Sequence, residues 1–136
     1  MAKYLLDTNH LSHAIRKVSP LRDRLRAAVR QGHRLGTCWP VLCELEVGIR
    51  QTANSDAVRR TLGAVLRDMR IWPMNWQVVS AYADLRLFAK SKGIAISHVD
   101  LVLGSLAQTM DTILLTTDND FQELKSVRSE NWIVVP

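Results

Sequence analysis

A chain of 136 residues buries roughly two thirds of its unfolded surface on folding, so a single domain spanning residues 1–136 is expected. Its hydrophobic content of 47% is ordinary for a globular protein, and no window approaches the roughly 18 consecutive apolar residues of a membrane span. The 18 Lys and Arg residues outnumber the 13 Asp and Glu, and the net charge of +5 favours a polyanionic partner without identifying one.

The first residues and the cysteines predict the compartment. Only three apolar or aromatic residues separate Lys3 from Asp7, too few for the apolar region of a secretory signal, so we expect a cytoplasmic protein. Cys38 and Cys43 lack the paired spacing of a zinc site, and we expect buried free thiols there. Neither cysteine is expected to take part in the chemistry.

Strands and helices alternate along the chain, which predicts an α/β fold with a parallel sheet covered on both faces. Strands are expected at residues 4–6, 34–38, 71–74, 112–116 and 132–135, and helices at 9–16, 20–32, 40–51, 55–69, 76–91 and 97–109, with a small helix from 119. Thr8 or Asn9 is expected to cap the first helix. Pro73 confines its strand to a sheet edge.

Three arginines of the second helix share one face. Arg22, Arg26 and Arg30 repeat at four-residue steps, opposite an apolar stripe. Two interpretations remain open for this face: side chains that are simply solvated, or a surface for RNA or a partner protein.

Two acidic residues follow the two most apolar strands. Asp7 comes directly after Tyr4-Leu5-Leu6, and Asp118 follows the strand at 112–116. Because the carboxyl ends of parallel strands meet at one edge of a sheet, we expect both carboxylates at that edge. Open α/β sheets bind their ligands there.

The third helix carries two glutamates with different neighbours. Glu46 has Arg50 four residues on, which predicts a surface ion pair. Glu44 instead has Gly48 four residues on, and glycine inside a helix costs about 1 kcal/mol relative to alanine. We therefore favour Glu44 as functional, with Gly48 allowing a close approach beside it.

Asp100 and Asp118 each allow more than one interpretation. Ser97 and Asp100 have the spacing of a capping box, so Asp100 is either part of a helix cap or a site residue. Asp120 and Glu123 have the same spacing, which favours Asp120 as the cap of the small helix and leaves Asp118 free to bind a ligand.

Four acids thus remain as candidates for one site: Asp7, Glu44, Asp100 and Asp118. Two carboxylates about 4 Å apart repel by roughly 4 kcal/mol at an effective dielectric constant of about 20, so four of them need protons or a bound cation to converge. Hard oxygen ligands without His or Cys favour Mg²⁺ or Mn²⁺. A metal site in a basic protein suits phosphodiester hydrolysis, in which metal ions activate water and arginines hold the nucleic-acid backbone.

Four motifs together resemble those of the PIN-domain ribonucleases, and most closely the VapC-type toxins of bacterial and archaeal toxin–antitoxin pairs. They are Leu5-Leu6-Asp7-Thr8-Asn9 with Ser12, Glu44-Leu45-Glu46-Val47-Gly48, Asp100 followed by the small residues Gly104, Ser105 and Ala107, and Thr116-Thr117-Asp118-Asn119-Asp120-Phe121. Each motif alone is weak, whereas the four in this order and at these separations are specific. The resemblance spans nearly the whole chain.

This resemblance implies a three-layer PIN-like fold whose central parallel sheet has the strand order 3-2-1-4-5. It implies an endoribonuclease that depends on Mg²⁺ or Mn²⁺ and hydrolyses RNA. Asp7, Glu44 and Asp100 match the family's core metal-binding and catalytic acids. Asp118 matches the fourth and most variable acid, with Asp120 as its alternative.

The same resemblance implies supporting residues and partners. Asn9 and Thr116 match polar positions that orient the metal-binding carboxylates, and Ser12 belongs to the same group. A homodimer is also implied, as is a cognate antitoxin whose C-terminal segment covers the site.

Two other functions compete with this hypothesis. A haloacid-dehalogenase-like phosphatase also begins with an apolar strand ending in Asp, but it requires a second Asp two residues later, where this chain has Asn9. A catalytically degenerate PIN-like domain that binds RNA or a protein partner needs only the basic surface. The intact acids argue against degeneracy.

Overall fold

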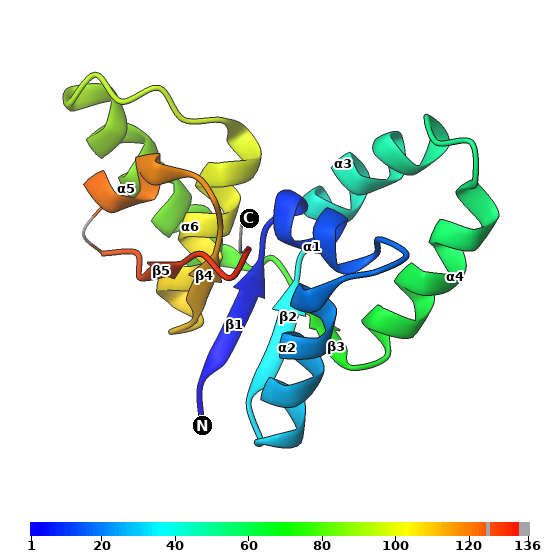
Figure 1. The fold of residues 1–136 in the computed structure, drawn as a ribbon. Coiled ribbons are helices and arrows are strands. Elements are labelled where there is room, and N and C mark those ends of the chain that lie inside the picture. The colour runs from blue at the N-terminus through cyan, green and yellow to red at the C-terminus, as the bar shows by residue number, and fades with distance from the viewer. Residues whose placement is uncertain (125, 134–136) are drawn as a thin grey trace.

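The computed structural model describes residues 1–124 and 126–133. Its strands are β1 (Lys3–Leu6), β2 (Arg34–Thr37), β3 (Met69–Ile71), β4 (Ile113–Leu115) and β5 (Ser129–Glu130). Its helices are α1 (Thr8–Ala14), α2 (Pro20–Arg30), α3 (Trp39–Arg50), α4 (Ser55–Leu66), α5 (Trp76–Ser91), α6 (His98–Thr109) and the 3₁₀ helix η1 (Asn119–Glu123). The strands form one parallel sheet in the order β3-β2-β1-β4-β5, which confirms the predicted α/β fold and strand order (Figure 1).

Helices cover both faces of the sheet. In Figure 1, α1 and α2 lie in front of it and α5 and α6 lie behind it, while α3 and α4 extend beyond the β3 edge. Parallel crossovers are right-handed, so the chain places helices on one face as it moves from β1 to β2. It places them on the other face when it returns from β3 to β4, which explains the three layers.

The two central strands are apolar throughout their carboxyl halves. Leu5, Leu6, Leu114 and Leu115 are fully buried, and Leu6 lies opposite Leu115 in the parallel register. The pairing continues one residue further, because the backbone N–H of Asp7 donates to the carbonyl of Leu115 at 3.1 Å. The sheet thus fixes the backbone of Asp7 at its carboxyl edge.

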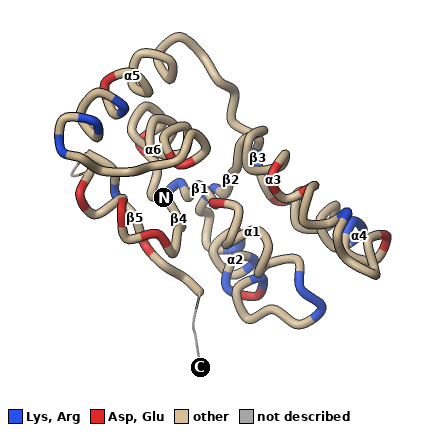
Figure 2. The backbone as a smooth tube through the Cα atoms, turned by 90° about the horizontal axis from the view of Figure 1, so that it is seen from above, with Lys and Arg blue, Asp and Glu red and all other residues tan. Residues whose placement is uncertain are grey.

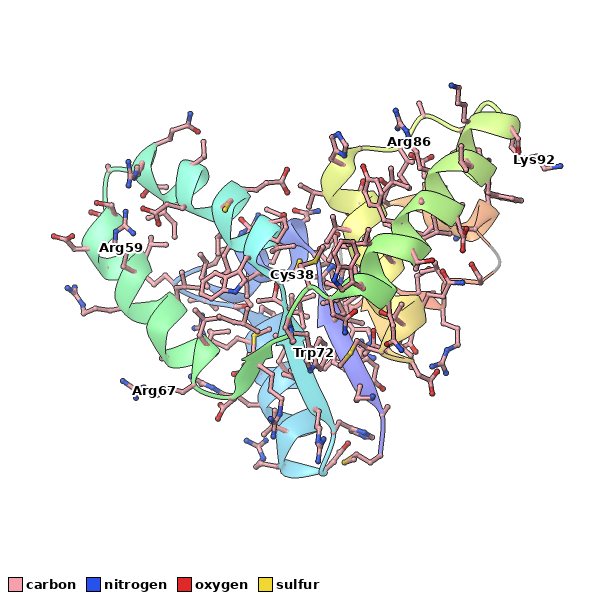
Figure 3. All side chains as sticks on the ribbon, turned by 180° about the vertical axis from the view of Figure 1, so that it is seen from behind. Cys38, Arg59, Arg67, Trp72, Arg86 and Lys92 are labelled. Carbon is pink, nitrogen blue, oxygen red and sulfur yellow. The ribbon has the colours of Figure 1, made fainter. Side chains whose placement is uncertain are left out.

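A glycine in β2 makes room for a tryptophan that closes the core. A Cβ atom on Gly36 would lie 2.5 Å from ring carbons of Trp72. Trp72 is 5% exposed and lies near Cys38 in the middle of the molecule (Figure 3). Any larger side chain at residue 36 would force the indole away from the sheet.

Most helix boundaries follow the predicted signals. Ser19 caps α2 by accepting the N–H of Arg22 at 3.0 Å, and Asn75 caps α5 by accepting that of Val78 at 3.0 Å. Past the end of α5, Gly93 has a φ of +68°, a left-handed conformation that glycine adopts without strain. The helix at 76–91 therefore ends where predicted.

One arginine on the shared face of α2, Arg22, forms hydrogen bonds within the fold. The guanidinium of Arg22 donates to the carbonyl oxygens of Ala14, Arg16 and Lys17, at 2.8, 2.6 and 3.1 Å. Arg22 thus ties the loop after α1 to α2, a third role beside the two interpretations that the sequence left open.

The last predicted strand is wrong. The strand is Ser129–Glu130, and Trp132 and Ile133 lie outside any strand, while the remainder of the predicted range, 134–135, lies outside the described residues. Trp132 packs on Tyr4 with ring centroids 4.7 Å apart, so its apolar character serves packing rather than pairing.

Two smaller differences concern β3 and Cys43. The edge strand β3 precedes Pro73, which is outside it. Cys38 is buried as predicted and burial raises the pKa of its thiol to about 11, whereas Cys43 is exposed. Both are free thiols. Within the described residues, no helix has the length and apolar character that crossing a membrane requires.

Candidate active site

Asp7 lies at the carboxyl edge of the sheet and is almost fully buried. The residue is 6% exposed, and its Oδ1 accepts the backbone N–H of His10 at 2.7 Å. This bond makes Asp7 the N-cap of α1, a role that the sequence had assigned to Thr8 or Asn9. The correction has a physical reason, because α1 begins directly at the strand end and only the residue before Thr8 has the extended backbone of a cap.

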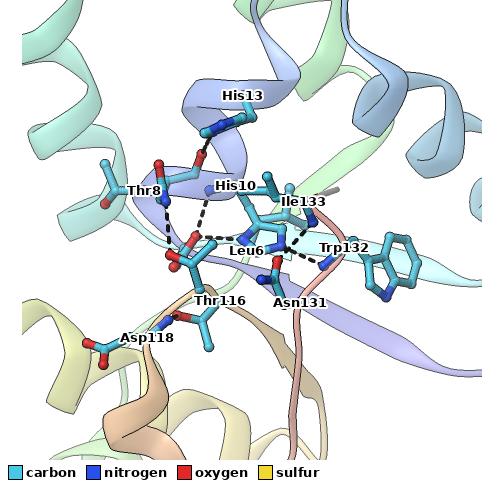
Figure 4. A network of polar contacts seen from close by, with 12 residues as sticks. Leu6, Thr8, His10, His13, Thr116, Asp118, Asn131, Trp132 and Ile133 are labelled. Atoms are coloured by element: carbon cyan, nitrogen blue, oxygen red, sulfur yellow. Dashed lines mark hydrogen bonds and ion pairs between the residues drawn. The ribbon is translucent and has the colours of Figure 1, made fainter. Parts of the chain in front are cut away.

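A histidine that sequence reasoning missed also contacts Asp7. His10 is fully buried, and its Nδ1 lies 3.1 Å from Asp7 Oδ1. Figure 4 shows His10 between the end of β1 and the segment that contains Trp132. A histidine three residues after the first acid, on the side of a helix that faces the core, was the available signal.

Asp100 and Asp118 come together near Asp7. Burial raises the pKa of Asp100 to about 6, and hydrogen bonding and charge repulsion from Asp118 add to the rise, with a smaller contribution from the charge of Asp7. Three of the four candidate acids thus lie near one another. Ser97 also accepts the backbone N–H of Asp100 at 3.2 Å, so Asp100 occupies a capping position and lies at the cluster as well.

Asp118, rather than Asp120, caps η1. Its Oδ1 accepts the backbone N–H of Asp120 at 2.8 Å, which reverses the assignment expected from the spacing to Glu123. The tight 3₁₀ turn explains the difference, because it starts at Asn119, two residues before the start that an Asp120 cap would imply. Asp118 remains half-buried beside Asp100, and Asp120 is exposed.

Glu44 lies at the opposite border of the site, on α3. Its Oε1 accepts a hydrogen bond from the hydroxyl of Thr8 at 2.5 Å, which links α3 to the residue after Asp7. Gly48 makes no close approach to another part of the described chain, contrary to expectation, since a Cβ there meets nothing within 4 Å. Gly48 instead helps line a hollow of about 270 Å³ between α1, α3 and α4 that begins at Thr8 and Glu44.

Glu46, the other glutamate of α3, belongs to a surface ion-pair network. Arg59 donates to both of its carboxylate oxygens at 2.6 Å, and Arg50 donates at 3.1 Å. The hydrogen bonds from Arg59 and then Arg50 lower the pKa of Glu46 to about 2. Figure 3 shows Arg59 at the outer side of the molecule, away from the sheet.

The three predicted supporting residues, Asn9, Thr116 and Ser12, make different contacts around the acids. The Asn9 amide donates to Thr117 at 2.9 Å and so joins α1 to the segment after β4. Thr116 is buried and its hydroxyl accepts the backbone N–H of Asp118 at 3.1 Å. Ser12 is exposed and lines the hollow next to Glu44.

Acidic and basic stretches both lie around the carboxyl edge of the sheet. Figure 2 looks onto this edge, with acidic stretches of α6, α3 and the turn after β1 around the centre, and with basic stretches further out on α4 and α5, which carry acidic stretches as well. This layout suits a polyanion whose backbone is held at the periphery while one bond reaches the acids. Among residues 1–124 and 126–133, no three acidic, His or Cys side chains are already arranged to hold a metal ion.

Comparisons with known proteins identify the family to which this fold belongs. Residues 4–127 match the model of the PIN domain family. Ribonuclease VapC2 of Rickettsia felis is 25% identical over 130 residues, which cover 95% of this chain and 97% of that protein.

Solved structures resemble the fold over nearly the full chain. The structure of VapBC2 from Rickettsia felis bound to a promoter DNA fragment superposes with a TM-score of 0.86 at 24% identity, covering 96% of this chain and 99% of that one. DNA-bound VapBC from Salmonella typhimurium gives 0.83 at 18% identity, covering 98% and 100%. FitAcB from Neisseria gonorrhoeae gives 0.75 at 24% identity, covering 94% and 96%. With the family model matching most of the sequence and the strand order agreeing, this chain belongs to the PIN domain family.

Proposed function

We propose that this protein is a cytoplasmic endoribonuclease that depends on Mg²⁺ or Mn²⁺ and acts as the toxin of a toxin–antitoxin pair. The single observation that carries the proposal is the grouping of Asp7, Asp100 and Asp118 at the carboxyl edge of the sheet, where burial first, then Asp118 and to a smaller extent Asp7, raise the pKa of Asp100 to about 6. The name of the related Rickettsia felis ribonuclease supports RNA as the substrate.

The donor set fits a hard divalent cation. Asp7, Glu44, Asp100 and Asp118 offer only carboxylate oxygens, which Mg²⁺ and Mn²⁺ prefer. Burial is the largest cause of the raised pKa of Asp100, and repulsion from Asp118 adds to it; a cation bound between the two carboxylates would relieve that repulsion. Because no three of these groups are prearranged among the described residues, binding would require side-chain movements at the cluster.

The chain's own residues would share the catalytic work as follows. The bound cation would supply a more acidic water and neutralise charge that develops on the phosphate. Asp7, fixed by the sheet, would orient the site, and Asp100 and Asp118 would add their carboxylates beside it. Thr8 would hold Glu44 toward the site through its hydroxyl, and Asn9 would keep the segment after β4 in place through Thr117.

The hollow between α1, α3 and α4 suits an antitoxin segment. It runs from Thr8 and Glu44 at the acids to Thr52 and Val58, and its floor includes Ile49. An extended or helical segment lying there would cover the site while burying apolar side chains. The descriptions of the similar VapBC structures, which are complexes of two proteins, support this partner.

We also propose a homodimer, which exposed apolar side chains on α3 and around the start of α5 support. Trp39 and Val47 are exposed on α3, and Met74, Trp76 and Val79 are exposed at the start of α5, with Trp76 84% exposed. Figure 3 shows the N-terminal ends of these helices on the same side of the molecule, on either side of Trp72. Exposed apolar surface of this kind marks an interface more often than a solvated face.

Cleavage of a mixed pool of RNA oligonucleotides tests the proposed activity. The purified protein should cleave RNA with Mg²⁺ or Mn²⁺ and not with EDTA, and Asp7→Asn and Asp100→Asn should each lose cleavage. Asp111→Asn is the matched control, because Asp111 is an exposed acid whose φ of +52° asparagine readily adopts. Full cleavage by both site variants would refute the proposal, and RNA binding without cleavage by the wild type would favour the degenerate alternative.

A further inference from the structure

His10 is a buried histidine with a hydrogen-bond partner at each ring nitrogen. Its Nε2 accepts the backbone N–H of Trp132 at 3.1 Å, and its Nδ1 lies 3.1 Å from Asp7 Oδ1 (Figure 4). The ring is fully buried, so these contacts replace the water that would otherwise satisfy both nitrogens. The imidazole therefore bridges the first acid of the site and the segment after β5.

The two contacts together determine the tautomer. A backbone N–H can only donate, so Nε2 must be the unprotonated nitrogen. The ring hydrogen then lies on Nδ1 and donates to Asp7 Oδ1. In this tautomer His10 adds a hydrogen-bond donor to Asp7 without adding a positive charge that would compete with a cation.

The Asp7 carboxylate is consequently held at one of its two oxygens. Oδ1 accepts both the backbone N–H of His10, at 2.7 Å, and its ring Nδ1–H, at 3.1 Å. Two donors on one oxygen fix the plane of the carboxylate, and within the described part of the chain Oδ2 accepts no hydrogen bond. One oxygen is thus used for orientation and the other is left for a ligand.

The far end of the bridge is itself firmly held. Trp132 is buried, and its ring packs between Tyr4, with centroids 4.7 Å apart, and the guanidinium of Arg24, 4.0 Å from the ring centroid. Its indole N–H donates to Glu130 at 2.9 Å. The backbone that selects the His10 tautomer therefore has little freedom to move.

We infer that His10 is a positioning residue for the metal-binding carboxylate: the Trp132 backbone holds its ring in the Nδ1–H tautomer, and that hydrogen aims Asp7 at the cation. This inference rests on the proposed metal site at Asp7. Partners of this kind, which hydrogen-bond a metal ligand without touching the metal, typically contribute about 10- to 100-fold to metal affinity.

Two substitutions separate the two hydrogen bonds. In His10→Asn the side-chain amide reaches the position of Nδ1 and can still donate to Asp7, but nothing replaces the Nε2 acceptor. In His10→Gln the longer side chain reaches the position of Nε2 and can still accept the Trp132 N–H, but the donor to Asp7 is lost. His33→Asn is the matched control, because the asparagine amide reaches the position of His33 Nδ1, which also accepts a backbone N–H, from Ala2 at 3.0 Å, far from the acids.

The expected results differ in opposite directions for the two variants. Titration with Mn²⁺ alone, followed by calorimetry, should show His10→Gln binding about 10-fold or more weakly than wild type, with His10→Asn within a few-fold of it. Hydrogen exchange should show the Trp132 amide protected in His10→Gln and deprotected in His10→Asn. Nitrogen NMR of the wild-type ring should show a protonated Nδ1 and an unprotonated Nε2.

Mn²⁺ binding by the wild type and by the two variants separates the metal site from the role of His10. If wild-type protein bound no Mn²⁺ at all, the metal site itself would be refuted. If wild type bound Mn²⁺ and the two His10 variants bound it equally, or if NMR showed the hydrogen on Nε2, the positioning role alone would be overturned.

Discussion

The two borders of the candidate site differ in how firmly the chain holds them. On the strand side, which we define as Asp7 and His10, the carboxylate is 6% exposed and one of its oxygens accepts two hydrogen bonds. On the helix side, defined as Glu44 and the hollow between α1, α3 and α4, the carboxylate is exposed and Thr8 is its hydrogen-bond donor.

The site therefore combines a firmly positioned carboxylate, on the strand side, with a solvent-accessible one, on the helix side. The strand side inherits its rigidity from the sheet core, because the backbone N–H of Asp7 still pairs with β4. The helix side belongs to α3 and α4, which extend beyond the sheet edge (Figure 1). A preformed carboxylate facing an adjustable one suits a site that binds a cation and an RNA backbone and is then covered by a partner.

The largest expected effect concerns stability on the two sides. Leu5→Ala removes a fully buried side chain beneath Asp7 and should lower the free energy of unfolding by about 2–5 kcal/mol. Leu62→Ala, in half-buried α4, should cost about half as much, since less apolar surface is removed from water. Urea denaturation of both variants measures the comparison, and equal losses would show that the two sides are equally well packed.

The next effect concerns cleavage. Asp7→Asn removes a charge from the fixed carboxylate and should lower single-turnover cleavage of RNA by more than about 100-fold, beyond the range for residues that only support a ligand. Glu44→Gln should cost about 10-fold, because an exposed side chain on α3 can be replaced in part by water. A larger loss from Glu44→Gln than from Asp7→Asn would contradict our inference that the strand side is held more firmly than the helix side.

Metal-linked stability should show the same asymmetry. A cation that binds only the folded protein stabilises it by about 2.7 kcal/mol at a hundredfold excess over its dissociation constant. Thermal unfolding with Mn²⁺ and with EDTA measures this gain, which Asp7→Asn should largely abolish and Glu44→Gln should retain in part. An identical melting temperature of the wild type in both solutions would argue against a cation site.

The sequence predicted the layout of the molecule well because that layout depends on local signals. Apolar runs such as Leu5-Leu6 and Leu114-Leu115 indicate buried strands, and N-cap residues such as Ser19 mark where helices begin. The strand order came from the family resemblance and is confirmed. The strand expected at 132–135 was wrong at its described residues, Trp132 and Ile133, because an apolar run does not reveal whether it packs or pairs, and Trp132 packs on Tyr4.

The sequence placed Asp7 and Asp118 at one sheet edge but did not predict the individual contacts of the site, some of which join residues far apart in the sequence. The role of His10 can be inferred only from the structure, because it depends on the hydrogen bond from the distant Trp132 backbone. The spacing of Asp120 and Glu123 favoured the wrong cap, since the choice depends on where the 3₁₀ turn begins. Asp100 had two competing interpretations, and the structure places it both at the helix start and beside Asp118.

The smallest effect follows from the pKa of Asp100. Burial and Asp118 raise this pKa in the folded protein to about 6 from an ordinary value of 3.8, so the folded state binds the proton more tightly than the unfolded state. The associated stability is fully present below about pH 4 and is lost as the pH rises through about 6. After allowance for solvent screening of a half-exposed group, the loss should be on the order of 1 kcal/mol.

Asp100→Asn should remove this pH dependence in EDTA. Relative to wild type, the variant should gain about 1 kcal/mol of unfolding free energy between pH 4 and pH 7, because asparagine never becomes charged. Any change in the cap with Ser97 shifts both pH values alike, so the change in the difference is the quantity to measure by urea denaturation. Asp56→Asn, at an exposed acid of α4, is the control and should give a flat difference. A flat difference for Asp100→Asn as well would mean that neither burial nor Asp118 raises the pKa of Asp100 in solution, and the acidic cluster would then be looser and more hydrated than its geometry indicates.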